Sequence, residues 1–219
     1  MSKIALKSKY FLEELPEDYH IKFLAQEKNV FHGSDETEWI GKALYFQIVR
    51  IGNLADLKTR YSEHNIYRSW MVYDENEREI GRMPAYLDID GHYRDPDLTK
   101  AHEATNWVID TIKQFCALKD DDFRVVFSGQ KGFHVEIRRP GECSKELASL
   151  LKSDNGYNTH FGHSSSGGTV LDKQHDYLRL HGTINTTDQD TPPRRCFVMT
   201  VDEFRNSDVS MMLEESEKK

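Results

Sequence analysis

The sequence predicts an α+β fold whose main part has strands and helices in the order β-α-β-β-α-β. Three observations predict this order. A short apolar run over residues 84–91 ends in Asp-Ile-Asp-Gly, which is typical of a strand followed by a turn. Apolar residues then recur at helical spacing over 99–117. Two strand-like runs, 124–128 and 133–137, flank a glycine-rich turn and predict a β-hairpin.

Residues 1–65 are expected to form an N-terminal α/β unit that packs against this module. Over residues 1–34 charged and apolar residues alternate, which indicates one or two short helices or a strand. Asp35 precedes Glu38 at the spacing of a capping box, and an apolar pattern that reaches Phe46 follows it. A helix is therefore expected from about residue 36 onward.

The main unit is expected over residues 66–205. Its β-branched, aromatic and apolar runs predict strands at 66–73, 84–91, 124–128, 133–137, 169–172, 177–180 and 196–201. Helices are expected at 99–117 and 145–152, and residues 206–219 are expected to be a polar tail. From residue 84 the order is the split-βαβ or RRM-like arrangement, in which the third strand lies between the first and second and the fourth flanks the first.

Composition narrows the class of protein. The chain has 219 residues, enough for one substantial core, and a formal net charge of −8. Its three cysteines show no Cys-x-x-Cys spacing, which argues against a disulfide framework and a cysteine zinc site. No apolar run is long enough for a membrane span and no signal peptide is recognisable, so we expect a cytoplasmic protein with no membrane partner. The acidic balance predicts weak binding to nucleic acid.

Two aspartates close the strand at 84–91. Asp88 and Asp90 are two residues apart, so on a strand their side chains share a face, with Ile89 on the other. Two neighbouring carboxylates repel each other unless a cation lies between them, and hard divalent cations prefer oxygen ligands. A Mg²⁺ or Mn²⁺ site is therefore the first hypothesis.

The hairpin turn carries a second set of polar residues. Ser128-Gly129-Gln130-Lys131-Gly132-Phe133-His134 joins two strands, its glycines let backbone amides approach an anion, and Lys131 and His134 can donate to phosphate oxygens. The apolar residues of the hairpin form one face, which sends His134 and Glu136 to the other. If that face also carries Asp88 and Asp90, acids and a histidine converge. The alternative without a functional site is an ordinary hairpin turn with an exposed histidine.

Taken together, Asp-x-Asp, a later Ser-Gly-x-x-Gly-x-His and an apolar-apolar-Asp at 170–172 resemble the archaeo-eukaryotic primase superfamily of primases and primase-polymerases. The resemblance covers roughly residues 66–190. It implies a template-directed nucleotidyltransferase in which Asp88, Asp90 and Asp172 hold two divalent metal ions. It further implies that the incoming nucleotide is bound by a set of residues in the turn and beyond it: Ser128, Gly129, Lys131, Gly132, His134, Arg179 and Asn185.

The resemblance also implies partners. These are a single-stranded DNA or RNA template, an NTP or dNTP, and a helicase, a large primase subunit or another replication domain. One departure from the family is the zinc knuckle that many relatives carry. Here only Cys143, His160 and His163 lie in the corresponding loop, so structural zinc is not expected.

Three other functions remain open. A non-catalytic RRM-like module that binds single-stranded nucleic acid shares the fold, but it would carry stacking aromatics where this sheet carries acids. A metal-dependent nuclease would use Glu136 and Arg138 as a loose Glu-x-basic pair, which leaves the glycine turn and His134 unexplained. A glycosyltransferase with Asp-x-Asp would normally be larger, with a parallel sheet.

Overall fold

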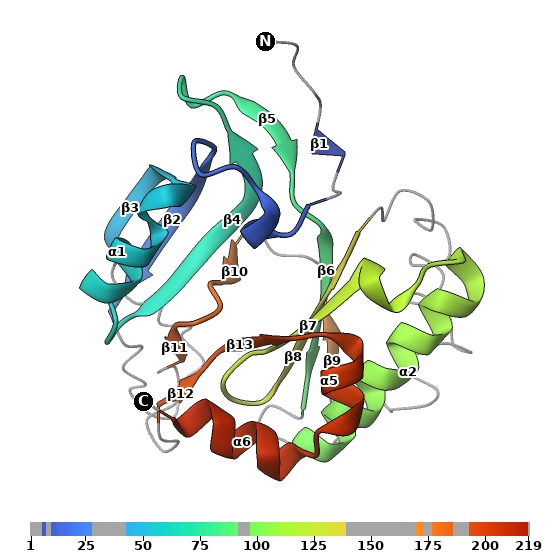
Figure 1. The fold of residues 1–219 in the computed structure, drawn as a ribbon. Coiled ribbons are helices and arrows are strands. Elements are labelled where there is room, and N and C mark those ends of the chain that lie inside the picture. Colours follow the sequence, from blue (N-terminus) through green and yellow to red (C-terminus); the bar gives the residue numbers. More distant parts are fainter. Residues whose placement is uncertain are drawn as a thin grey trace, which may run out of the picture.

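In the computed structural model the chain forms an α+β fold, and the structure describes residues 6–7, 10–27, 43–91, 97–138, 170–172, 177–185 and 193–218. The described residues form two large sheets and a two-stranded sheet of β11 (Ile184–Asn185) and β12 (Arg194–Arg195). Figure 1 shows the two sheets side by side, with the N-terminal strands at upper left and the module from residue 85 at lower right. The predicted fold class is confirmed.

The module sheet has the strand order β13-β7-β8-β6-β9, and every neighbouring pair is antiparallel. Its strands are β6 (Ala85–Asp90), β7 (Phe123–Phe127), β8 (Gly132–Ile137), β9 (Val170–Asp172) and β13 (Phe197–Met199). Numbered within the module, the order of the first four strands is 4-1-3-2, as the split-βαβ arrangement predicts. Strand β13 extends the sheet beyond β7.

Within the described residues three helices cover one face of the module sheet: α2 (Leu98–Cys116), α5 (Val201–Asn206) and α6 (Val209–Glu217). Residues at every second position of the strands, among them Ile89, Phe133 and Val135, are fully buried against these helices. Because side chains alternate across a strand, Asp88, Asp90 and His134 are turned to the opposite face. The helices therefore fix which face is left for the polar residues.

The second sheet, here called the N-terminal sheet, has the order β1-β5-β4-β2-β3. Its strands are β1 (Leu6–Lys7), β2 (His20–Gln26), β3 (Ala43–Arg50), β4 (Asn65–Tyr73) and β5 (Glu79–Arg82), and β10 (Tyr177–Arg179) pairs with the first half of β4. The short helix α1 (Leu54–Arg60) and the 3-10 turn η1 (Leu12–Glu14) contribute Leu12, Leu54 and Leu57 to the core on one face. A core of its own holds this sheet together.

A buried ion pair joins the two sheets. Arg68 on β4 donates to the carboxylate of Glu136 on β8, and both side chains are almost fully buried. Cation–π contacts also fix the N-terminal segment to the module. The guanidinium groups of Arg124 and Arg138 lie over the ring of Phe11, at 4.1 and 4.2 Å from its centre. These contacts hold the N-terminal sheet against the polar face of the module.

Two expectations were wrong. The helix expected from residue 36 does not include Ala43–Arg50, which is strand β3: Tyr45 and Val49 face the core while Leu44 and Phe46 face outward, a period of two. Residues 206–219 are not a mere polar tail, because α6 forms there, with Asp208 capping its N-terminus and Met212 buried in the module core.

Other expectations fall between these outcomes. The hairpin, the long helix and the strand over 66–73 are confirmed, whereas the strand expected at 196–201 ends at Met199, where α5 follows. The helix expected at 145–152 and the candidate zinc ligands at 143, 160 and 163 lie outside the described residues. The domain boundary at residue 65 stays a prediction. Among the described residues no helix is long and apolar enough to cross a membrane.

Candidate active site

One row of the module sheet collects the predicted acids and the histidine. Asp88 on β6 is paired with His134 on β8 and, on its other side, with residue 172 on β9. Directly opposite residues on antiparallel strands are the closest neighbours that a sheet provides. The fold thus brings residues from three separate sequence motifs to one row, with Asp90 two positions further along β6.

Each described acid has a cationic neighbour. Nε2 of His134 lies 3.2 Å from Oδ1 of Asp88, and Nζ of Lys131 lies 2.9 Å from Oδ2 of Asp90. The two acids are about four-fifths buried, whereas the side chain of Lys131 is one-third exposed. The cluster is therefore sheltered on the acid side and open to solvent on the lysine side.

The electrostatics of the pair are those of crowded carboxylates. Burial raises the pKa of Asp90, and the charge of Asp88 raises it further, against the opposing effect of Lys131. Burial lowers the pKa of His134, but the charge and hydrogen bond of Asp88, with the charge of Asp90, outweigh it and the net pKa is raised. Two carboxylates at this spacing form a site that favours a cation.

A third ligand is needed to hold a divalent metal ion here. Among the described side chains, no group of three His, Cys, Asp or Glu residues is arranged to hold one. The ladder sets residue 172 directly opposite Asp88, although the side chain of Asp172 is outside the described part. The donor chemistry fits Mg²⁺ or Mn²⁺, because both ions prefer oxygen ligands and Asp88 and Asp90 supply carboxylate oxygens on one face of β6.

The hairpin turn requires glycine for conformational and steric reasons. Gly129 has a φ of +83°, a left-handed conformation that favours glycine, and a Cβ there would lie 2.9 Å from the carbonyl oxygen of Arg194. The backbone carbonyl oxygen of Ser128 accepts a hydrogen bond of 2.8 Å from Nδ2 of Asn185. The backbone N–H of Ser128 donates to the carbonyl oxygen of Gly132 at 3.0 Å and so closes the turn. Asn185 therefore braces the turn, a contact that its predicted role did not include.

Arg179 is a buried cation held by neutral groups. Its Nη1 donates to Oδ1 of Asn65 at 2.9 Å, and its Nη2 donates to the hydroxyl of Tyr67 at 3.0 Å. The residue is 8% exposed, and within the described part of the chain it forms no ion pair with a carboxylate. Its positive charge nevertheless acts on His134, where it opposes the net rise in pKa that Asp88 and Asp90 cause against the effect of burial. An arginine in this state is suited to an anion.

The predicted residues thus fall into three groups in the structure. Asp88 contacts His134, Asp90 contacts Lys131, and residue 172 is opposite Asp88 in the ladder. Ser128, Gly129 and Gly132 belong to the adjoining turn, to which Asn185 is hydrogen-bonded, and Arg179 lies apart with Asn65 and Tyr67. Asn65 and Tyr67, which orient Arg179, were not predicted. Asn65 and Tyr67 could be predicted only from the pairing of β10 with β4, which sets Arg179 opposite Tyr67. No local sequence pattern reveals this pairing.

Comparisons with known proteins find little. No family model and no curated protein matches the chain. Among solved structures the chain is similar to the polymerase domain of Mycobacterium tuberculosis Ligase D in complex with DNA, with 14% sequence identity, a TM-score of 0.45, and coverage of 85% of this chain and 75% of that one.

Proposed function

We propose that the chain is a template-directed nucleotidyltransferase of the primase or primase-polymerase kind. The observation that carries the proposal is the row His134, Asp88 and residue 172, in which three motifs distant in sequence become neighbours. An ordinary hairpin with an exposed histidine does not account for it, because His134 is buried against Asp88.

Asp88, Asp90 and Asp172 would hold two divalent cations on the polar face of the module. When bound, two such cations supply activation of a 3′-hydroxyl and stabilisation of a leaving pyrophosphate. The residues of the chain position the reactants around them. Because phosphoryl chemistry needs mainly alignment and charge compensation, three acids on neighbouring strands are a sufficient scaffold.

The nucleotide would be bound by the cationic groups around the acids. Lys131 and His134 each contact one carboxylate, so each is within reach of a phosphate that approaches the same carboxylates with its cations. Arg179 adds a cation that no carboxylate of the described part neutralises. Charge-assisted hydrogen bonds from these groups favour the triphosphate over a neutral ligand.

The nuclease alternative has less support. Its Glu-x-basic pair, Glu136 and Arg138, is engaged elsewhere: Glu136 in the buried ion pair with Arg68, and Arg138 in an ion pair with Glu14. Both residues therefore have structural explanations.

Labelled nucleotide incorporation on homopolymer templates tests the proposed function. Each of the four homopolymer strands, primed or unprimed, is incubated with each labelled NTP or dNTP and with Mg²⁺ or Mn²⁺. The proposal predicts metal-dependent incorporation of the complementary nucleotide alone. Incorporation on none of the templates, or shortening of the strands in its place, would overturn it.

A further inference from the structure

The outward face of the N-terminal sheet carries aromatic and apolar side chains that are not in the core. On β2 the buried Ile21, Phe23 and Ala25 alternate with Lys22 and Leu24, which face outward. On β3 the outward positions include Leu44 and Phe46, which are 40% and 51% exposed. They are among the most exposed large apolar side chains of the described part.

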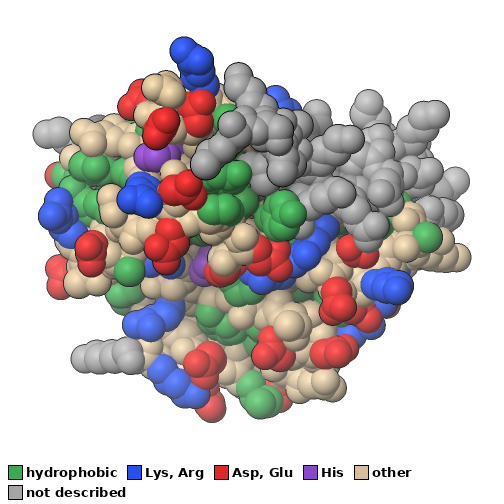
Figure 2. All heavy atoms as spheres, turned by 45° about the horizontal axis from the view of Figure 1, so that its top comes forward, with side chains coloured by type: hydrophobic (Ala, Val, Ile, Leu, Met, Phe, Trp, Pro, Cys, Tyr) green, Lys and Arg blue, Asp and Glu red, His purple; other side chains and the backbone are tan. Residues whose placement is uncertain are grey.

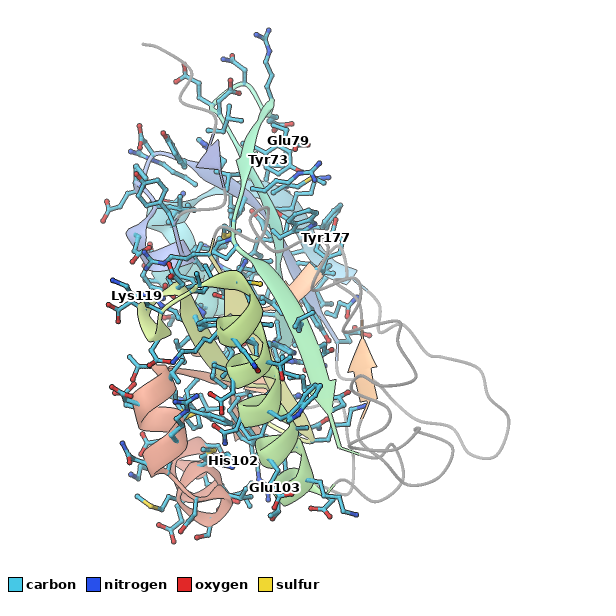
Figure 3. All side chains as sticks on the ribbon, turned by 90° about the vertical axis from the view of Figure 1, so that its right-hand side faces the viewer. Tyr73, Glu79, His102, Glu103, Lys119 and Tyr177 are labelled. Carbon is cyan, nitrogen blue, oxygen red and sulfur yellow. The ribbon has the colours of Figure 1, made fainter. Side chains whose placement is uncertain are left out.

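Rings from distant strands meet on this face. Phe46 on β3 and Tyr177 on β10 are separated in the sheet by β2 and β4, yet their ring centroids are 5.9 Å apart in an edge-to-face arrangement. A pocket of about 150 Å³ opens beside Tyr177, lined by Lys22, Ser69, Trp70, Met71, Tyr73 and Tyr177. Figure 3 shows Tyr73 and Tyr177 on the same side of the molecule. We call these residues, with Phe46, the aromatic face.

Cationic groups lie against the rings of the aromatic face and its rim. Nζ of Lys22 is 5.4 Å from the ring centre of Tyr73, and the guanidinium carbon of Arg82 is 4.7 Å from that of Trp70. Elsewhere the surface is mixed in charge: on the face shown in Figure 2, Asp and Glu side chains alternate with Lys and Arg. Of these rings Phe46 is exposed, Trp70 and Tyr177 are half-buried and Tyr73 is buried. Accessible rings with adjacent cations are the kind of surface that binds single-stranded nucleic acid by stacking.

The aromatic face continues into the candidate active site. Tyr177 and Arg179 are two residues apart on β10 and so face the same side of that strand. The charge of Arg179 acts on His134, which contacts Asp88. A strand of nucleic acid lying on Phe46 and Tyr177 would therefore lead along β10 toward the acids.

We propose that the aromatic face binds single-stranded nucleic acid, with bases stacked on Phe46 and Tyr177 and phosphates near Lys22 and Arg82. The occupant is the template strand, an assignment that rests on the proposed function, whereas the stacking itself does not. Every base offers an aromatic surface, so this binding is tolerant of sequence. Binding by stacking needs few phosphate contacts, so a protein with a net charge of −8 can bind nucleic acid in this way.

Fluorescence anisotropy with a labelled single strand of about 15 nucleotides tests this proposal, since sites of this kind span up to about that length. Phe46→Ala and the Phe46→Ala/Tyr177→Ala pair are each expected to raise the dissociation constant, by about tenfold or more per ring. Phe46→Trp should retain binding. Met211→Ala is the matched control, because Met211 is 55% exposed and lies on α6. Unchanged affinity in the double variant would overturn the proposal.

Salt dependence and crosslinking supply independent measurements. Lys22→Ala should lower the slope of log affinity against log salt by about 0.7, the value of one phosphate contact on a single strand. The ring variants should leave that slope unchanged. Photo-crosslinking of a strand that contains 5-bromouracil should label peptides carrying Phe46 or Tyr177, and labelling confined to other peptides would contradict the proposal.

The binding experiment is separable from the proposed function because it uses no nucleotide and no turnover. Binding that depends on Phe46 and Tyr177, without any incorporation, would support the aromatic face and overturn the nucleotidyltransferase. Incorporation that is unaffected by Phe46→Ala at limiting template would support the enzyme and overturn the aromatic face.

Discussion

Gly132 and Asp90 stand directly opposite each other in the ladder between β8 and β6, and they are so close that no side chain fits on Gly132. A Cβ atom there would come within 2.1 Å of the carbonyl oxygen of Ile89 and 2.6 Å of Oδ1 of Asp90. From the sequence, this glycine was interpreted as giving an anion access to the backbone. The structure adds a steric reason, because the glycine lets β8 lie against the acid.

Replacing Gly132 by Ala should therefore destabilise the fold at the candidate site. Since the nearest atoms are mainly backbone, they cannot move aside cheaply, and the expected loss is about 1–3 kcal/mol in the free energy of unfolding. Urea unfolding measures it. Gly52→Ala is the control, with its nearest neighbour, Cβ of Glu17, at 3.3 Å. An equal effect of the two substitutions would contradict the steric explanation.

The ion pair between Arg68 and Glu136 should be costly to break from one side. Glu136→Leu leaves a buried guanidinium without its carboxylate, and about 3–5 kcal/mol of stability should be lost. The double replacement Arg68→Met/Glu136→Leu should recover most of that loss, because no buried charge remains. Lys100→Met, at an exposed pair with Asp97, should change stability by about 0.5 kcal/mol or less. A double variant no more stable than Glu136→Leu would show that the pair is not the cause.

Glu13 should make stability depend on pH in the acid range. Burial works to raise the pKa of Glu13, but the hydrogen bond and charge of His181, with the charge of Arg124, hold it well below its ordinary value of 4.5. A depressed carboxyl pKa stabilises the fold above the unfolded pKa, and this contribution is lost as pH falls below about 4.5. The stability advantage over Glu13→Gln should therefore be full at pH 7 and should shrink toward pH 3. An advantage that stayed constant with pH would exclude this linkage.

Arg179 should matter for the nucleotide more than for the template. Arg179→Lys keeps a positive charge but loses the planar fork that Asn65 and Tyr67 orient, so the KM for nucleotide should rise about tenfold to hundredfold. Steady-state kinetics at saturating template measure this change. Arg195→Lys, at an exposed arginine on β12 (Arg194–Arg195), is the control. A fall in template affinity at constant nucleotide KM would assign Arg179 to the template.

Much of the module could be predicted because its patterns are local. The alternation around Ile89, Phe133 and Val135 gave the buried face, and the turn with Gly129 and Gly132 gave the hairpin. Those two elements and the long helix α2 sufficed for the strand order, since few arrangements satisfy a split-βαβ connection.

Other features depend on contacts that no local pattern contains. Strand β3 was mistaken for the continuation of a helix because the outward Leu44 and Phe46 made both of its faces look apolar. The sequence does not indicate helix α6, because acidic residues outnumber the few apolar residues of the stripe with which Met212 packs into the module core. The setting of Arg179 depends on a strand pairing between residues more than a hundred positions apart.

In the proposed function the acids of β6 serve nucleotide transfer through bound metal ions. The most direct measurement compares metal-dependent incorporation by the unaltered protein, by Asp88→Asn/Asp90→Asn and by Asp121→Asn, an exposed aspartate in the 3-10 turn Asp120–Asp122. We expect incorporation to fall to background in the double variant alone. Its thermal stability should be unchanged or higher, because burial and the charge of Asp88, which raise the pKa of Asp90, no longer act on an ionised side chain. Mn²⁺-dependent incorporation that persists in a folded double variant would exclude a metal-binding role of Asp88 and Asp90 in nucleotide transfer.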